Sequence, residues 1–209
     1  MLLLLAIALR FLSGATYIRA VIAGRARPHV VPWFFWGLTA VISFLIQLSE
    51  HAGPVAFVSL ALALGPVIVF SLAVARGLHR VRFTRVDKIC VMLTVVGIVL
   101  WIATSNPLLA LWMSVAVDFV SSVPGLVKSY KLPYTEQALP YGISMVSMVI
   151  ALIGIQHWTL TAVLFPTYIF FINGLFVAIL TTDLRRRVAR LRYSIRLWQG
   201  RSEPVAAED

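Results

Sequence analysis

The chain has 209 residues, of which 60% are hydrophobic, and its formal net charge is +10 at pH 7. Apolar stretches of about twenty residues recur along it, each long enough to cross ~30 Å of hydrocarbon as a helix, which excludes an ordinary soluble domain. The positive charge does not indicate nucleic acid, because the basic residues lie beside apolar stretches and therefore favour anionic membrane lipid as a partner.

Seven of these stretches are predicted to be transmembrane helices, and the connectors between them are too short to fold separately. In chain order they cover residues 1–23, 31–49, 54–75, 89–105, 107–127, 138–156 and 158–182. A cleaved signal peptide at the N-terminus is the less favoured alternative, because no positive charge precedes its apolar run and Arg10 follows it. The predicted fold class is therefore an all-α integral membrane protein with seven transmembrane helices.

Lysine and arginine are distributed very unequally between the two sides of these helices. Of the 18 such residues, all but Arg10 lie near the ends of the first, third, fifth and seventh segments. The connectors at residues 50–55, 104–108 and 156–159 contain none. The positive-inside rule therefore places the N-terminus outside and the C-terminus in the cytoplasm, as in a protein of a bacterial inner (plasma) membrane. An even number of helices would not keep the basic connectors on one side.

The first three segments align with the last three when the chain is shifted by 108 residues. The shift lays Pro32 on Pro140 and Trp33 on Tyr141, and each pair opens the second helix of its set. Two sets of three helices joined by one helix must start on the same side, which the charge pattern also requires. We expect a 3+1+3 arrangement of parallel repeats, with boundaries at 1–78, 79–106, 107–182 and a basic tail at 183–209. The alternative is that evenly spaced helices align with themselves by chance.

This plan resembles the SWEET sugar transporters and the wider PQ-loop superfamily. The local resemblance is strongest at residues 121–133, SSVPGLVKSYKLP, where a proline late in a helix precedes a basic, proline-containing loop. It implies that such prolines act as hinges and that asparagines on the third helix of each set bind sugar. Pro124-Gly125 replaces the Pro-Gln dipeptide, and Asn173 has Gly65 as its counterpart. Sugar specificity therefore does not carry over.

Arg10 and Asp118 occupy equivalent repeat positions, each near the middle of its segment. A charge at the bilayer centre costs roughly 2.5–3.5 kcal/mol, so both side chains should face the bundle interior and each other. One interpretation is a gate or proton-sensitive pair that contacts the solute in a transport path. The other is a fixed structural ion pair.

Four further positions are candidates for contact with a solute or for bending a helix. Asn173 is an amide in an apolar helix, where it either binds a ligand or bridges two helices. Trp112, one and a half turns from Asp118, is a candidate for stacking on a ligand ring. Pro66 and Pro166, like Pro124, remove a backbone hydrogen bond and are hinge candidates or passive bends.

The tail is predicted to form an amphipathic helix on the inner membrane surface. Its apolar stripe consists of Leu184, Val188, Leu191, Ile195 and Trp198, and its lipid-binding candidates are Arg185, Arg186, Arg187, Arg190, Arg192 and Arg196. The alternative is a solvated continuation of the seventh segment whose charges only enforce topology.

The sequence predicts no enzyme and no cofactor. His-Glu-x-x-His, Gly-x-Ser-x-Gly and clustered carboxylates are all missing, and the single cysteine, Cys90, cannot form an intrachain disulfide or a cysteine-built metal site. The leading hypothesis is a carrier or facilitator of a small polar solute, with a midplane cavity between the repeats. The alternative is a membrane scaffold or sensor that binds a partner through its basic face, and the sequence leaves open whether the protein is a monomer or a homo-oligomer.

Overall fold

The computed structural model describes the whole chain except residues 27, 29, 76–84 and 183–209. The described part consists of helices and connectors and contains no strand. In chain order the helices are α1 (Leu2–Ile22), α2 (Val30–Ser49), α3 (Val55–Ala75), α4 (Arg85–Thr104), α5 (Pro107–Lys131), the 3-10 turn η1 (Pro133–Thr135), α6 (Ala138–Ile153) and α7 (Leu160–Thr181). The predicted all-helical architecture is therefore confirmed.

Six of these helices are long and apolar enough to cross a membrane. The exception is α6, whose 16 residues rise only about 24 Å. It ends at Ile153, where Gly154 caps it, and not at residue 156 as its hydropathy suggested. In contrast, α5 continues beyond residue 127 to Lys131, with Pro124 inside it.

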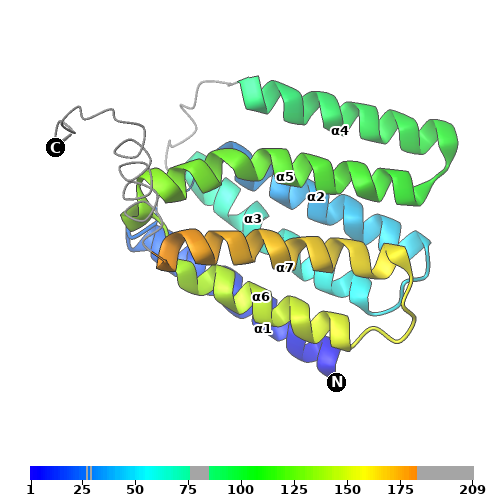
Figure 1. The fold of residues 1–209 in the computed structure, drawn as a ribbon, viewed down its shortest axis with the longest axis horizontal. Helices are drawn as coiled ribbons and strands as arrows, with labels where there is room; N and C mark the ends of the chain where they lie inside the picture. The colour runs from blue at the N-terminus through cyan, green and yellow to red at the C-terminus, as the bar shows by residue number, and fades with distance from the viewer. Residues whose placement is uncertain (27, 29, 76–84, 183–209) are drawn as a thin grey trace, which may run out of the picture.

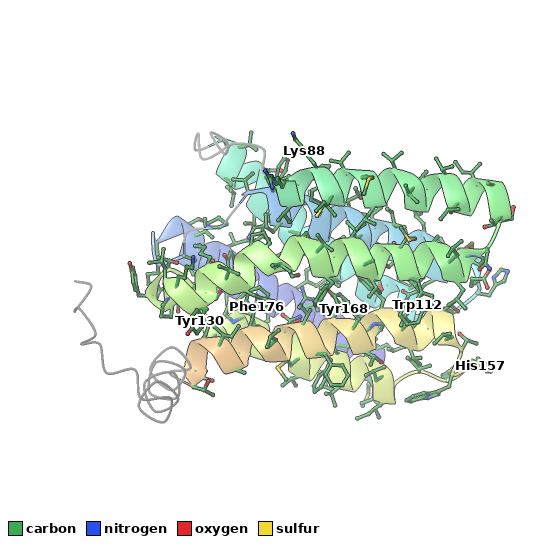
Figure 2. All side chains as sticks on the ribbon, turned by 45° about the horizontal axis from the view of Figure 1, so that its top comes forward. Lys88, Trp112, Tyr130, His157, Tyr168 and Phe176 are labelled. Carbon is green, nitrogen blue, oxygen red and sulfur yellow. The ribbon has the colours of Figure 1, made fainter. Side chains whose placement is uncertain are left out.

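The helices alternate in direction, so each end of the bundle holds the C-terminal end of one helix beside the N-terminal end of the next (Figure 1). Apart from Arg10, the lysines and arginines that the structure describes lie at one end, which we call the basic end: Arg19, Arg25, Arg85, Lys88, Lys128 and Lys131. Figure 2 shows His157 at the opposite end, which we call the far end. The one-sided charge distribution seen in the sequence is thus a property of the folded bundle.

Six of the helices form a closed ring of contacts, and the seventh, α4, lies outside this ring. We call α1, α2 and α3 the first triplet, in which α1 and α2 both pack on α3. We call α5, α6 and α7 the second triplet, in which α5 and α6 both pack on α7. Across the boundary α1 packs on α6, and α2 packs on α5. Helix α4 packs on α5 at the edge of the bundle (Figure 1).

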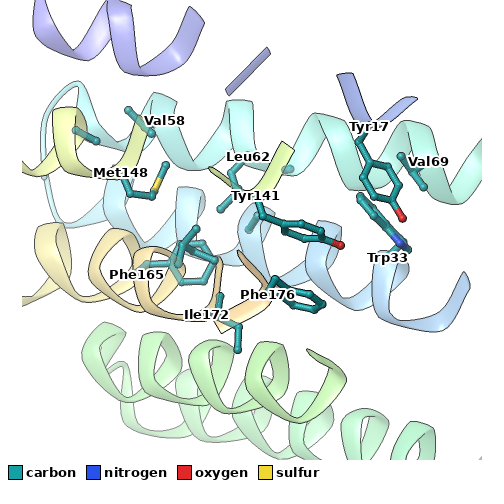
Figure 3. Close-up of a cluster of buried hydrophobic side chains, with 14 of the residues drawn as sticks. Tyr17, Trp33, Val58, Leu62, Val69, Tyr141, Met148, Phe165, Ile172 and Phe176 are labelled. Carbon is teal, nitrogen blue, oxygen red and sulfur yellow. The ribbon is translucent and has the colours of Figure 1, made fainter. Parts of the chain in front are cut away.

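The largest cluster of buried apolar side chains joins all the helices except α4 (Figure 3). Helix α4 instead packs through Cys90, which is buried against Phe35 and Val117. Cys90 is therefore a small apolar filler, as free cysteines commonly are. Helix α4 therefore lies outside the largest cluster.

Candidate functional site

A central cavity lies between the two triplets and contains about 660 Å³ of empty space, including the part that is open to solvent. Every helix of both triplets contributes to its wall, mostly from the middle of the helix towards the basic end. The lining residues are Arg10, Ser13, Gly14 and Tyr17; Trp33 and Trp36; Leu62, Gly65, Pro66 and Val69; Asp118 and Ser122; Pro140, Tyr141 and Ser144; and Ile169, Ile172, Asn173 and Phe176.

Arg10 projects from the middle of α1 into this cavity and is only 7% exposed. Its Nη1 donates a hydrogen bond to Oγ of Ser144 on α6. Its Nε is buried and meets no acceptor in the described part of the chain. A guanidinium has five N–H donors, so this cation is left far short of its hydrogen-bonding capacity.

Asp118, on α5, is buried and accepts hydrogen bonds on both carboxylate oxygens. Thr39 of α2 donates to Oδ1 at 2.8 Å, and Tyr168 of α7 donates to Oδ2 at 2.8 Å. Oγ1 of Thr39 also lies 2.9 Å from the carbonyl oxygen of Phe35, and a hydroxyl has one hydrogen to give. Asp118 therefore connects α5 with α2 and α7.

The expected direct contact between Arg10 and Asp118 is wrong. Both side chains line the cavity, but the structure forms no ion pair within 4.0 Å between these two described residues. Each finds neutral hydroxyl partners, and in each case one of them lies on the second helix of the other triplet. Two opposite charges therefore stand in one cavity without neutralising each other directly.

Five aromatic side chains form the part of the cavity wall nearest the basic end, and we call them the aromatic wall: Tyr17, Trp33, Trp36, Tyr141 and Phe176. Figure 3 shows Tyr17, Trp33, Tyr141 and Phe176. The rings of Tyr141 and Phe176 are stacked with centroids 4.5 Å apart. The centroids of Tyr17 and Trp33 are 4.4 Å apart. Trp33 lines the cavity although it opens its helix, and it is only 8% exposed.

Polar contacts hold this wall in place. The Tyr17 hydroxyl donates to Oε2 of Glu136 at 3.0 Å, and Glu136 also accepts from Nζ of Lys128 at 2.8 Å. Nε1 of Trp36 donates to Oγ of Ser122 on α5 at 2.9 Å. The wall is thus fixed by contacts from both triplets.

Of the predicted solute-binding residues Asn173 and Trp112, only Asn173 lines the cavity. Asn173 lines the cavity, and its amide nitrogen donates to the carbonyl oxygen of Ile169, one turn back on its own helix, at 2.7 Å. It therefore does not act as the bridge between helices that we had considered. Trp112 is 49% exposed and is not among the residues that line the cavity, so its assignment there is wrong. Six residues of helix rotate a side chain by about 600°, which turns Trp112 away from Asp118.

The three hinge candidates all lie inside continuous helices, Pro66 in α3, Pro124 in α5 and Pro166 in α7. Pro66 is the one that lines the cavity, together with Leu62 one turn earlier. Because proline has no N–H, the carbonyl of Leu62 lacks its usual helical partner at the cavity wall. Their action as hinges remains a prediction.

The far end of the bundle is closed by a tightly packed layer. Gln47 is completely buried there, accepts from Oγ of Ser59 at 2.7 Å and donates to the carbonyl oxygen of Thr161 at 3.3 Å. Ser147 donates to the carbonyl oxygen of Ala6 at 2.7 Å. These bonds join the triplets where the cavity does not reach.

Several functional neighbours escaped the sequence analysis, notably Thr39, Tyr168 and Ser144. A hydroxyl in an apolar helix is common, so nothing in the sequence distinguished these three from the others. Six arginines of the tail were predicted to bind lipid and lie outside the described residues: Arg185, Arg186, Arg187, Arg190, Arg192 and Arg196. Comparison with known proteins finds no family model, no curated protein and no solved structure that matches the chain.

Proposed function

We propose that this chain is an integral membrane protein that carries a small polar solute, or facilitates its passage, by alternating access at the central cavity. The proposal includes a 3+1+3 plan, in which α4 links two parallel triplets, with the N-terminus outside and the C-terminus in the cytoplasm. The short helix α6 would cross the membrane together with its flanking connectors, packed on α1 and α7 and with the exposed side chains of Leu139, Val146, Val149 and Ile153 facing lipid. Under this proposal the basic end faces the cytoplasm.

The exchange of helix contacts supports the repeat. The repeat makes α1, α2 and α3 equivalent to α5, α6 and α7 in that order. The packing of α1 on α6 then has the packing of α5 on α2 as its equivalent, and both contacts are present. The contacts within each triplet exchange in the same way. A chance alignment of evenly spaced helices would not require this pattern, whereas a two-fold axis along the membrane normal does.

The observation that carries the transport proposal is the position of the cavity. It lies on the boundary between the triplets, takes lining residues from both, and presents two unpaired opposite charges near the middle of their helices. Buried charges in membrane-spanning segments commonly mark solute or ion pathways. A rocking motion of one triplet against the other would expose the cavity to each side of the membrane in turn.

The resemblance to SWEET and PQ-loop proteins agrees with this proposal at the level of helix plan. It does not extend to sugar as the solute, because the paired asparagines of that family are not both present. Asn173 lines the cavity, but the equivalent position is Gly65. The solute must therefore be inferred from the residues of the cavity.

Alternating access can be tested with a single cavity cysteine in a variant that lacks Cys90. Ile172→Cys places a thiol in the cavity wall, and Lys131→Cys places a matched thiol on the exposed basic end. In proteoliposomes, a membrane-impermeant cationic thiol reagent should reach Cys at position 172 from both sides but Cys at position 131 from one side only. Reaction of position 172 from one side only, or from neither, would contradict alternating access and favour the scaffold or sensor.

The proposal also assigns the basic tail at 183–209 to anionic lipid of the inner leaflet. Attraction of this kind contributes roughly 1 kcal/mol per basic residue near the surface. The basic tail is compatible with a transporter and with a scaffold, since a scaffold would use the same face to bind its partner.

A further inference from the structure

We propose that the central cavity binds a small monocarboxylate, with the carboxylate on Arg10 and the apolar body of the molecule against the aromatic wall. This inference rests on the proposed function, since it names the class of solute that the same cavity would carry. It begins with a buried cation that has too few partners.

Arg10 has the hydrogen-bond donors for an anion and lacks an acceptor that could satisfy them. It donates to Ser144 alone in the described part of the chain, its Nε is buried without a partner, and no described carboxylate lies within ion-pair distance of it. A guanidinium presents parallel N–H groups whose spacing matches the two oxygens of a carboxylate. A carboxylate bound there would neutralise the charge and fill the open donors at the same time.

Ser144 extends this site by one further donor. Its Oγ accepts from Arg10, so its own hydrogen is free to point elsewhere, and it donates to none of the described residues. The carbonyl oxygen of Pro140, one turn earlier and the usual acceptor for such a serine, already accepts from Oγ of Ser13 at 2.7 Å. The Ser144 hydroxyl can therefore donate to the same carboxylate as Arg10.

The charge balance of the cavity favours a monoanion. Arg10 and Asp118 are the two charged residues in its wall, and Asp118 is already supplied with two hydroxyl donors. A phosphate dianion would bring two negative charges to one guanidinium in a cavity that already holds a carboxylate. A carboxylate brings one, which matches the single cation that lacks an anionic partner.

The remaining wall favours an apolar body over a sugar. Beyond the charged residues it consists largely of aromatic and aliphatic side chains, including Trp33, Tyr141, Phe176, Leu62 and Ile172. A sugar carries a hydroxyl on nearly every carbon, and each would need a partner after leaving water. An aliphatic or aromatic chain needs none and gains from burial against the rings.

The test is direct binding to the purified full-length protein, measured by isothermal titration calorimetry and by the fluorescence of its tryptophans. The probes are two matched sets of three, 3-phenylpropanoate with 3-phenylpropanol and 3-phenylpropylamine, and butyrate with butanol and butylamine. In at least one set the acid should bind about 10- to 100-fold more tightly than the alcohol and the amine, as expected for hydrogen bonds to a charged group. Equal binding of acid and alcohol, stronger binding of the amine, or no binding of either acid would overturn the proposal.

Arg10→Gln should abolish the preference for the acid, and Arg25→Gln, an exposed arginine at the basic end, should leave it unchanged. If Arg10→Gln does not yield folded protein, Ser144→Ala takes its place and should weaken the acid several-fold more than the alcohol. A preference for the acid that persists in the folded Arg10→Gln variant, or an alcohol and acid weakened equally by Ser144→Ala, would overturn the assignment to these residues.

Failure of this inference and failure of the transport proposal are distinguishable. Acid binding that requires Arg10, without uptake into proteoliposomes, would retain the anion site and contradict transport. Uptake of the alcohol, the amine or a sugar, without any binding of the acids, would retain transport and overturn the monocarboxylate. Inorganic phosphate that competes more strongly than the acids would also overturn it in favour of a dianion.

Discussion

Asp118 should be coupled energetically to Tyr168 more strongly than to Thr39, although both hydroxyls lie 2.8 Å from its carboxylate. The perturbation is Asp118→Ala, which removes the acceptor from both. The Tyr168 hydroxyl then loses its charged acceptor and is left beside Ser122, whose Oγ already accepts from Nε1 of Trp36. The Thr39 hydroxyl keeps the carbonyl oxygen of Phe35 at 2.9 Å and therefore loses little.

The difference between the two coupling energies follows from the acceptors that each hydroxyl can use. Hydrogen bonds between membrane helices contribute about 0.6 kcal/mol on average and up to about 1.7 kcal/mol in double-mutant cycles. The bond from Tyr168 is short and its acceptor is charged, so we expect a coupling of about 1–1.7 kcal/mol, near the upper limit. For Thr39, whose single hydrogen is shared with its own helix, we expect about 0.5 kcal/mol or less.

The assay is reversible unfolding in mixed micelles, with the free energy of unfolding measured for two double-mutant cycles. One combines Asp118→Ala with Tyr168→Phe, and the other combines it with Thr39→Val. Tyr134→Phe removes an equivalent hydroxyl from a side chain that is 77% exposed, and its effect should add to that of Asp118→Ala. Equal coupling energies in the two cycles, or additive effects of Asp118→Ala and Tyr168→Phe, would refute the claim that Tyr168 depends on Asp118 more than Thr39 does.

Three further predictions concern topology, the buried charges and the tail. In a cysteine-free background, a cysteine that replaces His157 should react with an impermeant reagent from outside the cell, and one that replaces Arg25 only after permeabilisation; the reverse labelling would invert the proposed orientation. Because Arg10 and Asp118 form no ion pair, the losses of stability caused by Arg10→Gln and Asp118→Asn should add within about 1 kcal/mol, whereas a larger rescue in the double variant would restore a direct pair. A synthetic peptide of residues 183–200 should become helical on anionic vesicles and much less so on neutral ones, as circular dichroism would show, and equal helicity on both would remove the electrostatic part of the claim.

The sequence by itself determined the helices, their order and the end of the bundle at which the charges gather. These are local properties, because the length of an apolar run and the basic residues that flank it can be read without knowing any neighbour. Even here local signals had limits. Helix α5 continued beyond residue 127 to Lys131, and α6 stopped short at Gly154, since packing and capping decide the last turn of a helix.

The tertiary structure alone decided which side chains form the site. Arg10 and Asp118 were placed correctly in the interior, because a charge in an apolar helix has few other options, but their partners were not predictable. A partner depends on which helices lie side by side and how each is rotated. That rotation turned Trp112 away from the cavity and brought Trp33 into its wall. It also gave Arg10 and Asp118 separate hydroxyl partners and left both charges facing one cavity, where a solute can meet them.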